Sequence, residues 1–506
     1  MAAHEPNPSP AAEGARGEMF DRSGLAGHPR GLGTLFFTEL WERFSYYGLR
    51  ALLTLFMVAP LATGGLGLSV EQATRIYGTY LMSVYMLSIA GGTIADSLLG
   101  QRLTVLVGAI TIALGHFAMA VPTLATFYLG LMLIALGTGL LKPNISAMVG
   151  QLYHADDPRR EAGFSIFYMG INLGAFIAPF VTGFLASHSA FKRWLLDAGF
   201  DPAHSWHWGF GAAGVGMVIG IVCYLLFGAS LQRIGARPIA TVAGWSRVGT
   251  VLVGTALLWV LVWLSDQPAW QWLRLLFVLV PVGLVIWFGR ASDVETRRLA
   301  PVFALFLGAV AFWALFEQAG SSLNLFAERF TQERFLGIEF PAPWYQSANP
   351  IFVILLAPLF AWLWNSLGHR QPSSPAKFVV GLLFLAASFA IMIPAARLAL
   401  EGRVSPLWLL VMYFLQTVGE MWVSPVGLST FSKLSPPRLV GAMMGIWFLA
   451  TAFGNKLAGV LAGNFGEGQA TRLDAFFRQQ ALAVAGVAVV LALLVPWLQR
   501  RMGGVR

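Results

Sequence analysis

The stretch Glu39-Leu40-Trp41-Glu42-Arg43-Phe44-Ser45-Tyr46-Tyr47-Gly48-Leu49-Arg50 places two acids and two arginines inside an otherwise apolar segment that runs from Gly31 to Pro60. A charged side chain at the centre of a bilayer costs about 2.5 to 3.5 kcal/mol on insertion scales, so such residues usually face a bundle interior or a watery cavity. If the segment is a helix, Glu39, Arg43 and Tyr47 share one face. The sequence therefore predicts a charged and phenolic stripe on an apolar helix.

The composition of the whole chain is that of an integral membrane protein. Apolar residues make up 57% and charged residues 11% of the 506 residues, and the mean hydropathy is +0.68, far above that of soluble globular chains. Apolar runs of about 20 residues, the length of a spanning helix, recur along the chain. Because these runs are unbroken, they do not fit the alternating pattern of a membrane β-barrel. We predict an all-α membrane protein.

The apolar runs predict fourteen transmembrane helices and a defined orientation. They begin near Leu32, Val70, Leu103, Leu124, Ala162, Trp208, Val242, Trp270, Ala300, Tyr345, Phe378, Pro406, Val440 and Ala475. Basic residues concentrate in alternate loops, so the positive-inside rule places both termini in the cytoplasm. Because they form no single patch, we expect no nucleic-acid partner. Residues 1–30 lack the apolar core of a signal peptide, which indicates a disordered cytoplasmic tail.

The intramembrane charges recur at a regular spacing. After the first segment they fall at Lys142 in the fourth, Glu317 in the ninth and Glu420 in the twelfth, with Lys456 in the thirteenth as the exception. If segments seven and eight are an inserted pair, these become the first helices of three-helix units, and transporters built from such units bind substrate at the midplane between halves. The predicted domains are an N-terminal six-helix bundle at 31–230, a linker with an inserted two-helix hairpin at 231–297, and a C-terminal six-helix bundle at 298–500.

Four motifs resemble those of the proton-dependent oligopeptide transporter family of the major facilitator superfamily. The family's first-helix signature is similar to Glu39-x-x-Glu42-Arg43-Phe44-x-Tyr46-Tyr47-Gly48, and its motif in the loop after the second helix is similar to Gly91-Gly92-Thr93-Ile94-Ala95-Asp96-Ser97-Leu98-Leu99-Gly100-Gln101-Arg102. Its fifth-helix signature is similar to Phe167-Tyr168-Met169-Gly170-Ile171-Asn172-Leu173-Gly174. Its tenth-helix signature is similar to Gly419-Glu420 with Ser424-Pro425-Val426-Gly427-Leu428-Ser429. The resemblance covers nearly the whole chain. It implies the major facilitator fold, two six-helix bundles plus an inserted hairpin, and uptake of di- and tripeptides with protons.

The resemblance also implies roles for individual residues. Proton coupling falls to Glu39, Glu42 and Glu317, binding of the peptide carboxylate to Arg43 and Lys142, and binding of the peptide amine to Glu420 with Asn172 and Asn349. The residues that would line a side-chain pocket are Tyr46, Tyr47, Tyr85, Trp313, Ser424, Trp447 and Phe448. Arg50 with Glu317, and Asp96 with Arg102, would act as gates.

Several of these assignments have plainer alternatives. Glu39, Glu42, Arg43 and Lys142 could form a static ion network, and Glu317 could be hydrogen-bonded to Gln318 or Ser321. For Tyr85, Trp447 and Phe448, packing is the simpler interpretation. His116 and Lys456 receive no role. The resemblance to mammalian members suggests a second-helix histidine for protons, but residues 70–95 contain none, which shifts proton transfer to carboxylates.

We therefore expect a proton-coupled symporter of di- and tripeptides that works by alternating access in the bacterial inner membrane, as a monomer. An alternative keeps the fold and changes the cargo to nitrate, another small anion or a peptide-like metabolite. Glu420 argues against a simple anion because a desolvated carboxylate would repel it. An enzyme would need a nucleophile beside a base or a cluster of metal ligands, and no such motif lies on a membrane segment. We expect no cofactor and no metal.

Overall fold

The computed structural model describes residues 21–503 except 155–156, 233, 237, 239, 437–439 and 466–471. Thirteen helices in this part of the chain are long and apolar enough to cross a membrane. The helix α2 (Arg30–Val58) is 29 residues long and is a fourteenth candidate by its length, although each of its 18-residue windows contains at least three charged side chains. The all-α membrane fold is confirmed. Most of the predicted tail lies outside the described residues.

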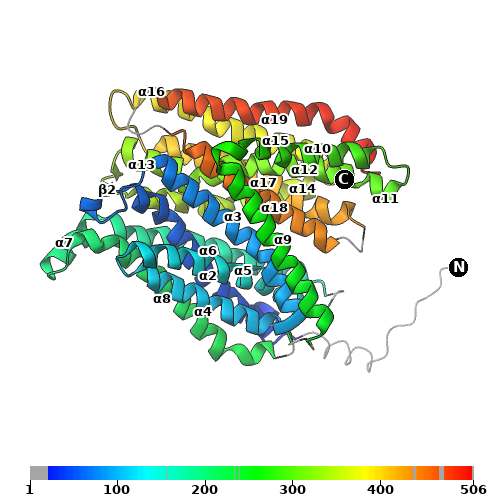
Figure 1. Cartoon of the computed structure of the whole chain (residues 1–506), viewed down its shortest axis with the longest axis horizontal. Coiled ribbons are helices and arrows are strands. Elements are labelled where there is room, and N and C mark those ends of the chain that lie inside the picture. The colour runs from blue at the N-terminus through cyan, green and yellow to red at the C-terminus, as the bar shows by residue number, and fades with distance from the viewer. Residues whose placement is uncertain are drawn as a thin grey trace.

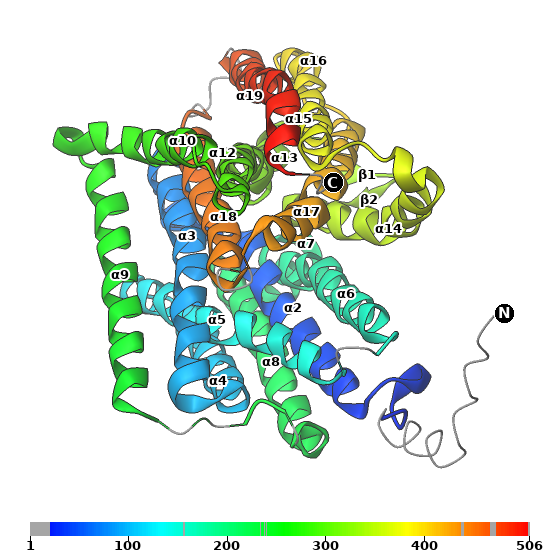
Figure 2. The same ribbon diagram turned by 90° about the vertical axis from the view of Figure 1, so that its right-hand side faces the viewer.

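The N-terminal half of the chain forms one helical bundle. It consists of α2, α3 (Val70–Ile94), α4 (Gln101–Met119), α5 (Leu124–Gln151), α6 (Arg160–Ser187) and α8 (Ser205–Leu226). Short elements join them: η1 (Leu25–Gly27), η2 (Leu61–Thr63), the π-helical turn η3 (Ala95–Leu99), α7 (Ser189–Asp197), η4 (Pro202–His204) and η5 (Gly228–Leu231). Figure 2 shows these helices grouped below the C-terminal ones.

The C-terminal half forms a second bundle. Its long helices are α12 (Leu299–Phe316), α14 (Ala348–Leu367), α15 (Ser374–Ala390), α17 (Leu407–Leu434), α18 (Val440–Ala462) and α19 (Leu473–Arg501). Between them lie η7 (Glu317–Gly320), α13 (Ser322–Phe330), β1 (Arg334–Phe335), β2 (Ile338–Glu339), η8 (Ala342–Ser347), η9 (Gly368–Arg370) and α16 (Met392–Leu398). The strands β1 and β2 pair antiparallel. The inserted segment contains α9 (Val242–Asp266), η6 (Pro268–Leu275), α10 (Leu276–Gly289) and α11 (Val294–Arg297).

The ends of the helices follow from local sequence. Ser69 and Gln72 form a capping box at the start of α3, in which each side chain accepts a hydrogen bond from the other's backbone N–H at 3.2 Å. Gly100 separates η3 from α4 with a φ of 76°, a conformation that costs glycine little. This glycine lies in the predicted loop motif, so the motif's turn has a direct conformational reason.

The structure differs from the sequence prediction in two helices. The predicted eighth segment begins near Trp270, but this residue lies in η6, and α10 begins only at Leu276. The ninth segment is broken: α12 ends at Phe316, and a non-helical Ser321 separates η7 from α13. A Cβ atom on Gly320 would lie 2.0 Å from the hydroxyl oxygen of Tyr77. The break therefore brings α3 and η7 closer than any larger residue permits. The predicted domain boundaries stay a prediction.

We call the end of the molecule at which α2 begins the proximal end and the end at which α2 finishes the distal end. Figure 1 shows α7, α13 and β2 together at the distal end, on the left, with α11 and the C-terminus at the opposite end. Because successive spanning helices alternate in direction, the connections after α2, α6 and α12 all lie at the distal end. This assignment fixes which contacts join the bundles at each end.

Hydrogen bonds in both directions tie the two bundles together at the distal end. Asn324 donates its side-chain N–H to the backbone oxygen of Ala51 at 2.8 Å. The indole of Trp344 donates to the backbone oxygen of Phe180 at 3.2 Å, and the hydroxyl of Ser347 to that of Phe176 at 2.8 Å. In β2, the carboxylate of Glu339 accepts hydrogen bonds from the backbone and the hydroxyl of Ser189, the first residue of α7. The described conformation is therefore closed at its distal end.

Candidate functional site

A buried cluster of three charges lies on the inner face of α2. The Nε atom of Arg43 lies 3.1 Å from an oxygen of Glu39, and Arg43 also contacts the carboxylate of Glu42. All three side chains are at most 4% exposed. One oxygen of each carboxylate has no hydrogen-bond partner among the described residues. Since an unpaired buried carboxylate oxygen is costly, the cluster is suited to bind a proton or to attract a further cation.

Lys142 of α5 is a cation without a carboxylate partner. Its Nζ atom lies 4.0 Å from the centroid of the Tyr85 ring on α3, a cation–π contact. No ion pair of Lys142 is found in the part of the chain that the structure describes. Lys142 as a whole is partly exposed, and it remains free to meet an anion. The structure thus leaves Lys142 available although it buries Arg43.

Arg50 and Glu317 connect the two bundles. An Nη atom of Arg50, on α2, lies 3.0 Å from a carboxylate oxygen of Glu317, at the point where α12 gives way to η7. The Nε atom of Arg50 donates to the hydroxyl of Tyr77 at 3.0 Å. The alternative in which Gln318 binds Glu317 is not what the structure contains, because Gln318 donates to the backbone oxygen of Ala314 and accepts from Ser322.

Glu420 lies in the C-terminal bundle with hydrogen-bond donors but no cation beside it. The side-chain N–H₂ of Asn349, on α14, donates to Glu420 at 2.9 Å and to the hydroxyl of Thr417 at 3.0 Å. No ion pair of Glu420 is found among the described residues. Asn349 therefore orients a carboxylate whose negative charge is not neutralised by a neighbouring side chain.

The aromatic residues expected to form a side-chain pocket fall into two groups. Tyr46 and Tyr47 lie over the guanidinium groups of Arg43 and Arg50, at 5.0 and 5.7 Å from their ring centroids. Trp447, in contrast, is 3% exposed and packs with its ring 5.3 Å from that of Phe431.

The remaining expected members differ in exposure. Trp313 is buried, with an indole N–H that has no partner among the described residues. Phe448 is 37% exposed, and Ser424 is partly exposed on α17. Asn172 is buried, and its side chain donates to the backbone oxygen of Tyr168, one helical turn earlier on α6. Asn172 therefore bonds within its own helix, whereas Asn349 bonds Glu420.

The predicted latch between Asp96 and Arg102 is not formed in the described conformation. Asp96 accepts a hydrogen bond from the side chain of Gln101 at 3.3 Å. The backbone of Arg102 donates to Gly235 and accepts from Tyr224 instead. The two charged groups lie in the connection at the proximal end. In the described residues no group of three or more His, Cys, Asp or Glu side chains is placed to hold a metal ion.

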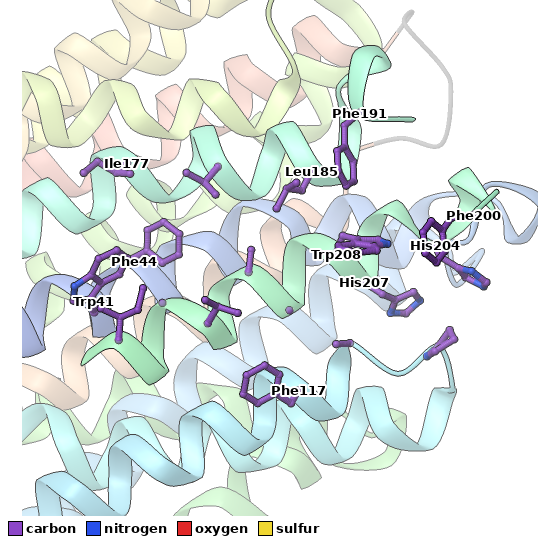
Figure 3. A pocket seen from close by; sticks show the side chains of 18 of the residues that line it. Trp41, Phe44, Phe117, Ile177, Leu185, Phe191, Phe200, His204, His207 and Trp208 are labelled. Atoms are coloured by element: carbon purple, nitrogen blue, oxygen red, sulfur yellow. The ribbon is translucent and has the colours of Figure 1, made fainter. Parts of the chain in front are cut away.

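A large apolar cavity lies outside the charged site. It has a volume of about 880 Å³ and is lined by residues of α2, α4, α6, α7 and α8. Figure 3 shows Trp41 and Phe44 at one end and the histidines His204 and His207 at the other. Trp41 and Phe44 belong to the face of α2 opposite the charges. The cavity is therefore an apolar groove of the N-terminal bundle and not part of the charged site.

Two polar residues of the site, and one acid outside it, were missed by sequence reasoning. Tyr77 and Thr417 complete the hydrogen bonding of Arg50 and Asn349, and Asp266 pairs with Lys456. A tyrosine or threonine in an apolar helix carries no local signal that distinguishes it from a packing residue. Asp266 ends an apolar run at a helix terminus, where an acid is expected to face water.

The sequence profile described as the POT family matches residues 102–478. The chain belongs to the POT family. It is 39% identical to the peptide transporter YePEPT of Yersinia enterocolitica, over 94% of this chain and 96% of that protein, and 37% identical to a di-/tripeptide transporter of Lactococcus lactis subsp. cremoris, over 95% and 98%.

A solved structure of a peptide transporter POT mutant in complex with alafosfalin has the same architecture as this POT family chain. The two superpose with a TM-score of 0.83 at 37% sequence identity, over 96% of this chain and 98% of that one. The family is one of membrane transporters, and both halves of the fold are included in the match. The function of the charged site is therefore to be sought in transport.

Proposed function

We propose that this protein is a symporter of di- and tripeptides that uses a proton gradient and works by alternating access. Its POT family membership and the two relatives named as peptide and di-/tripeptide transporters support the cargo. The observation that carries the proposal is the separation of charge across the site. Lys142, a cation without a carboxylate partner among the described residues, lies in the N-terminal bundle. Glu420, a carboxylate without a neighbouring cation among them, lies in the C-terminal bundle.

This separation fits the two ends of a short peptide. Lys142, with Arg43 beside it, would bind the peptide carboxylate, and Glu420, oriented by Asn349, would bind the peptide amine. Asn172 is proposed to add a hydrogen bond after a rotation away from its own helix. Because each clamp belongs to a different bundle, only a zwitterion of the right length joins them. A simple anion would meet Glu420 and be repelled.

The proposed proton coupling rests on the contact between Arg50 and Glu317. Protonation of Glu317 would remove its negative charge and release Arg50, which is the one arginine of α2 that reaches the other bundle. A local change of charge would thus weaken a contact between bundles and bias the equilibrium between two conformations. Glu39 and Glu42, each with an unpaired oxygen, are proposed as further proton acceptors near the peptide carboxylate.

We infer that the proximal end faces the cytoplasm, in line with the distribution of basic residues in the loops. Both termini would then be cytoplasmic, and the distal contacts would close the outer side of the membrane. Asp96 and Arg102 would form their pair only when the proximal end closes. We propose that the protein works as a monomer because each chain contains both halves of the site.

Uptake into liposomes tests the proposal. Purified protein is reconstituted, an inward proton gradient is imposed, and the uptake of radiolabelled dialanine is measured with and without an uncoupler. We expect accumulation that collapses with the uncoupler. Accumulation of dialanine that does not depend on the gradient would contradict proton coupling. No uptake of any di- or tripeptide by folded protein would contradict the proposed cargo and favour a small anion or a peptide-like metabolite.

A further inference from the structure

The inserted hairpin packs against both bundles where they meet. Most of α9 faces outward, and the few buried residues of its second half include Val262. Val262 packs in one cluster with Met82 and Met86 of α3 and Ala452 of α18. In α10, Phe277 lies with its ring 5.0 Å from that of Phe453 on α18. Figure 2 shows α9 running alongside α3. The hairpin therefore covers the boundary between the N-terminal and C-terminal bundles.

At this boundary α3 and α18 touch through their backbones. A Cβ atom on Gly459 would lie 2.4 Å from the backbone oxygen of Thr74, and one on Gly78 would lie 2.9 Å from that of Asn455. Small residues permit such close approach of helices in a membrane. A change in the angle between the bundles must separate or slide these two helices. The crossing of α3 and α18 is thus a place where a side-chain contact can hold one conformation.

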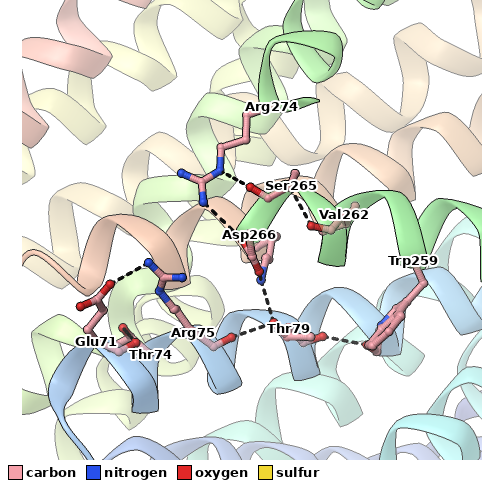
Figure 4. Close-up of polar contacts among 11 residues, drawn as sticks. Glu71, Thr74, Arg75, Thr79, Trp259, Val262, Ser265, Asp266 and Arg274 are labelled. Carbon is pink, nitrogen blue, oxygen red and sulfur yellow. Dashed lines mark hydrogen bonds and ion pairs between the residues drawn. The ribbon is translucent and has the colours of Figure 1, made fainter. Parts of the chain in front are cut away.

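Lys456 makes such a contact, one turn before Gly459. Its Nζ atom donates to the hydroxyl of Thr79, on α3, at 2.8 Å and to a carboxylate oxygen of Asp266, at the end of α9, at 2.5 Å. Figure 4 shows Asp266 between Thr79 on one side and Arg274 on the other. An Nη atom of Arg274 lies 3.6 Å from the second oxygen of Asp266. Lys456 is 9% exposed.

Among the nearby described charges, Arg274 also meets Asp266, through the carboxylate oxygen that Lys456 does not contact. Arg75 and Glu71 pair with each other at 2.7 Å on the exposed side of α3, and Arg274 also donates to the backbone oxygen of Ser265 at 2.9 Å. Removal of one member of a largely buried ion pair leaves the charge of the other less well compensated. The contact of Lys456 with Thr79 and Asp266 therefore contributes to the balance between two conformations that differ at this crossing.

We propose that Lys456 and Asp266 form a lock that joins the inserted hairpin to the crossing of α3 and α18 and stabilises the conformation closed at the distal end. The lock has one member in each of three parts of the chain: Thr79 in the N-terminal bundle, Lys456 in the C-terminal bundle and Asp266 in the hairpin. Opening of the distal end separates Thr79 from Lys456. The hairpin thereby takes part in the transport cycle without contacting the cargo. This inference rests on the proposed alternating access.

Distances between spin labels test the lock in the absence of cargo. Cys223, the only cysteine of the chain, is replaced by serine. Labels are then placed at Leu61 and Leu336, which are 75% and 85% exposed and lie at the distal ends of different bundles. We expect Lys456→Met and Asp266→Asn each to move part of the distance distribution to larger values, in lipid nanodiscs.

Arg75→Gln is the matched control, because it removes an exposed ion pair within α3 next to the lock and should leave the distribution unchanged. A cooperative thermal unfolding transition establishes that each variant is folded. If Lys456→Met does not fold, Asp266→Asn tests the lock in its place. An unchanged distribution in a folded variant of either residue would overturn the proposal. So would loss of gradient-driven uptake without any change in distance, which would make Lys456 a proton site. Failure of all peptide uptake would refute the proposed function and leave the distances informative.

Discussion

Arg50 and Glu317 lie 3.0 Å apart although 266 positions separate them in the sequence and each belongs to a different bundle. Tyr77 holds the arginine from a third helix, and Gly320 leaves room for the ring of that tyrosine. The ion pair is therefore built into the closed distal half of the molecule. The protonation of Glu317 and the contact between the bundles therefore depend on each other.

Substitution Glu317→Gln should abolish accumulation of dialanine driven by a proton gradient and spare exchange of internal for external dialanine. The amide cannot be protonated, so binding of a proton no longer controls Arg50. Gradient-driven uptake and counterflow are compared in the same liposomes. Glu71→Gln, which changes an exposed acid on α3, is the control and should retain both activities. Normal uphill uptake by Glu317→Gln would refute the proton-linked role.

Substitution Glu420→Ala should weaken binding of dialanine by about 30-fold or more. Loss of one partner of a desolvated charge pair costs about 2 kcal/mol or more, and the amine of the bound peptide would lose its counter-charge. Competition for dialanine uptake gives the affinities. An analogue without the amino group should lose little affinity, because it makes no contact with Glu420. Equal losses for both ligands would remove Glu420 from the amine site.

Substitution Gly174→Ala should lower the free energy of unfolding by about 1 to 3 kcal/mol, the usual cost of an overpacked interface. A Cβ atom on Gly174 would lie 2.2 Å from the backbone oxygen of Leu40, so α6 must move away from α2. Gly254→Ala is the control, because no atom lies within 4 Å of its added Cβ. Thermal unfolding in detergent distinguishes them. Equal stability of the two variants would contradict the close contact.

The contact between Glu339 and Ser189 predicts a dependence on the pH at the distal end. Burial raises the pKa of Glu339, but the hydrogen bonds from the hydroxyl and the backbone of Ser189, with the nearby His188 and Arg193, lower it below its ordinary value of 4.5. A lowered pKa in the closed state means that the contact stabilises that state fully above pH 4.5 and less as the pH falls through the lowered value. Acid should therefore favour opening of the distal end.

Spin labels at Leu61 and Leu336 also measure this effect. As the pH falls below 4.5, the fraction of long distances should rise in the parent protein. Glu339→Gln lacks the titrating group, so its distribution should change less over the same interval. Identical pH profiles for the two proteins would show that Glu339 does not contribute to the distal contact.

The helices could be predicted from the sequence because apolar length alone determines a membrane span. The start of each predicted segment lies within six residues of the observed helix, even at Trp270. The charged residues were also visible, since a charge such as Glu420 is rare in an apolar run. Their partners were not, because Tyr77, Thr417 and Asp266 come from helices whose relative placement depends on packing. Where the relevant signal was a contact between distant helices, the sequence carried no local trace of it.

Three of the distal hydrogen bonds run in one direction, from the C-terminal half to the N-terminal half. Asn324, Trp344 and Ser347 donate their side chains, whereas Ala51, Phe176 and Phe180 accept only through the main chain. A substitution on the accepting side leaves its carbonyl in place, but one on the donating side deletes the bond. At these three bonds, a single substitution in the C-terminal half therefore removes a hydrogen bond that a substitution in the N-terminal half leaves in place. In a scan of single substitutions for variants that lose these three distal bonds, the informative positions should come from the C-terminal half.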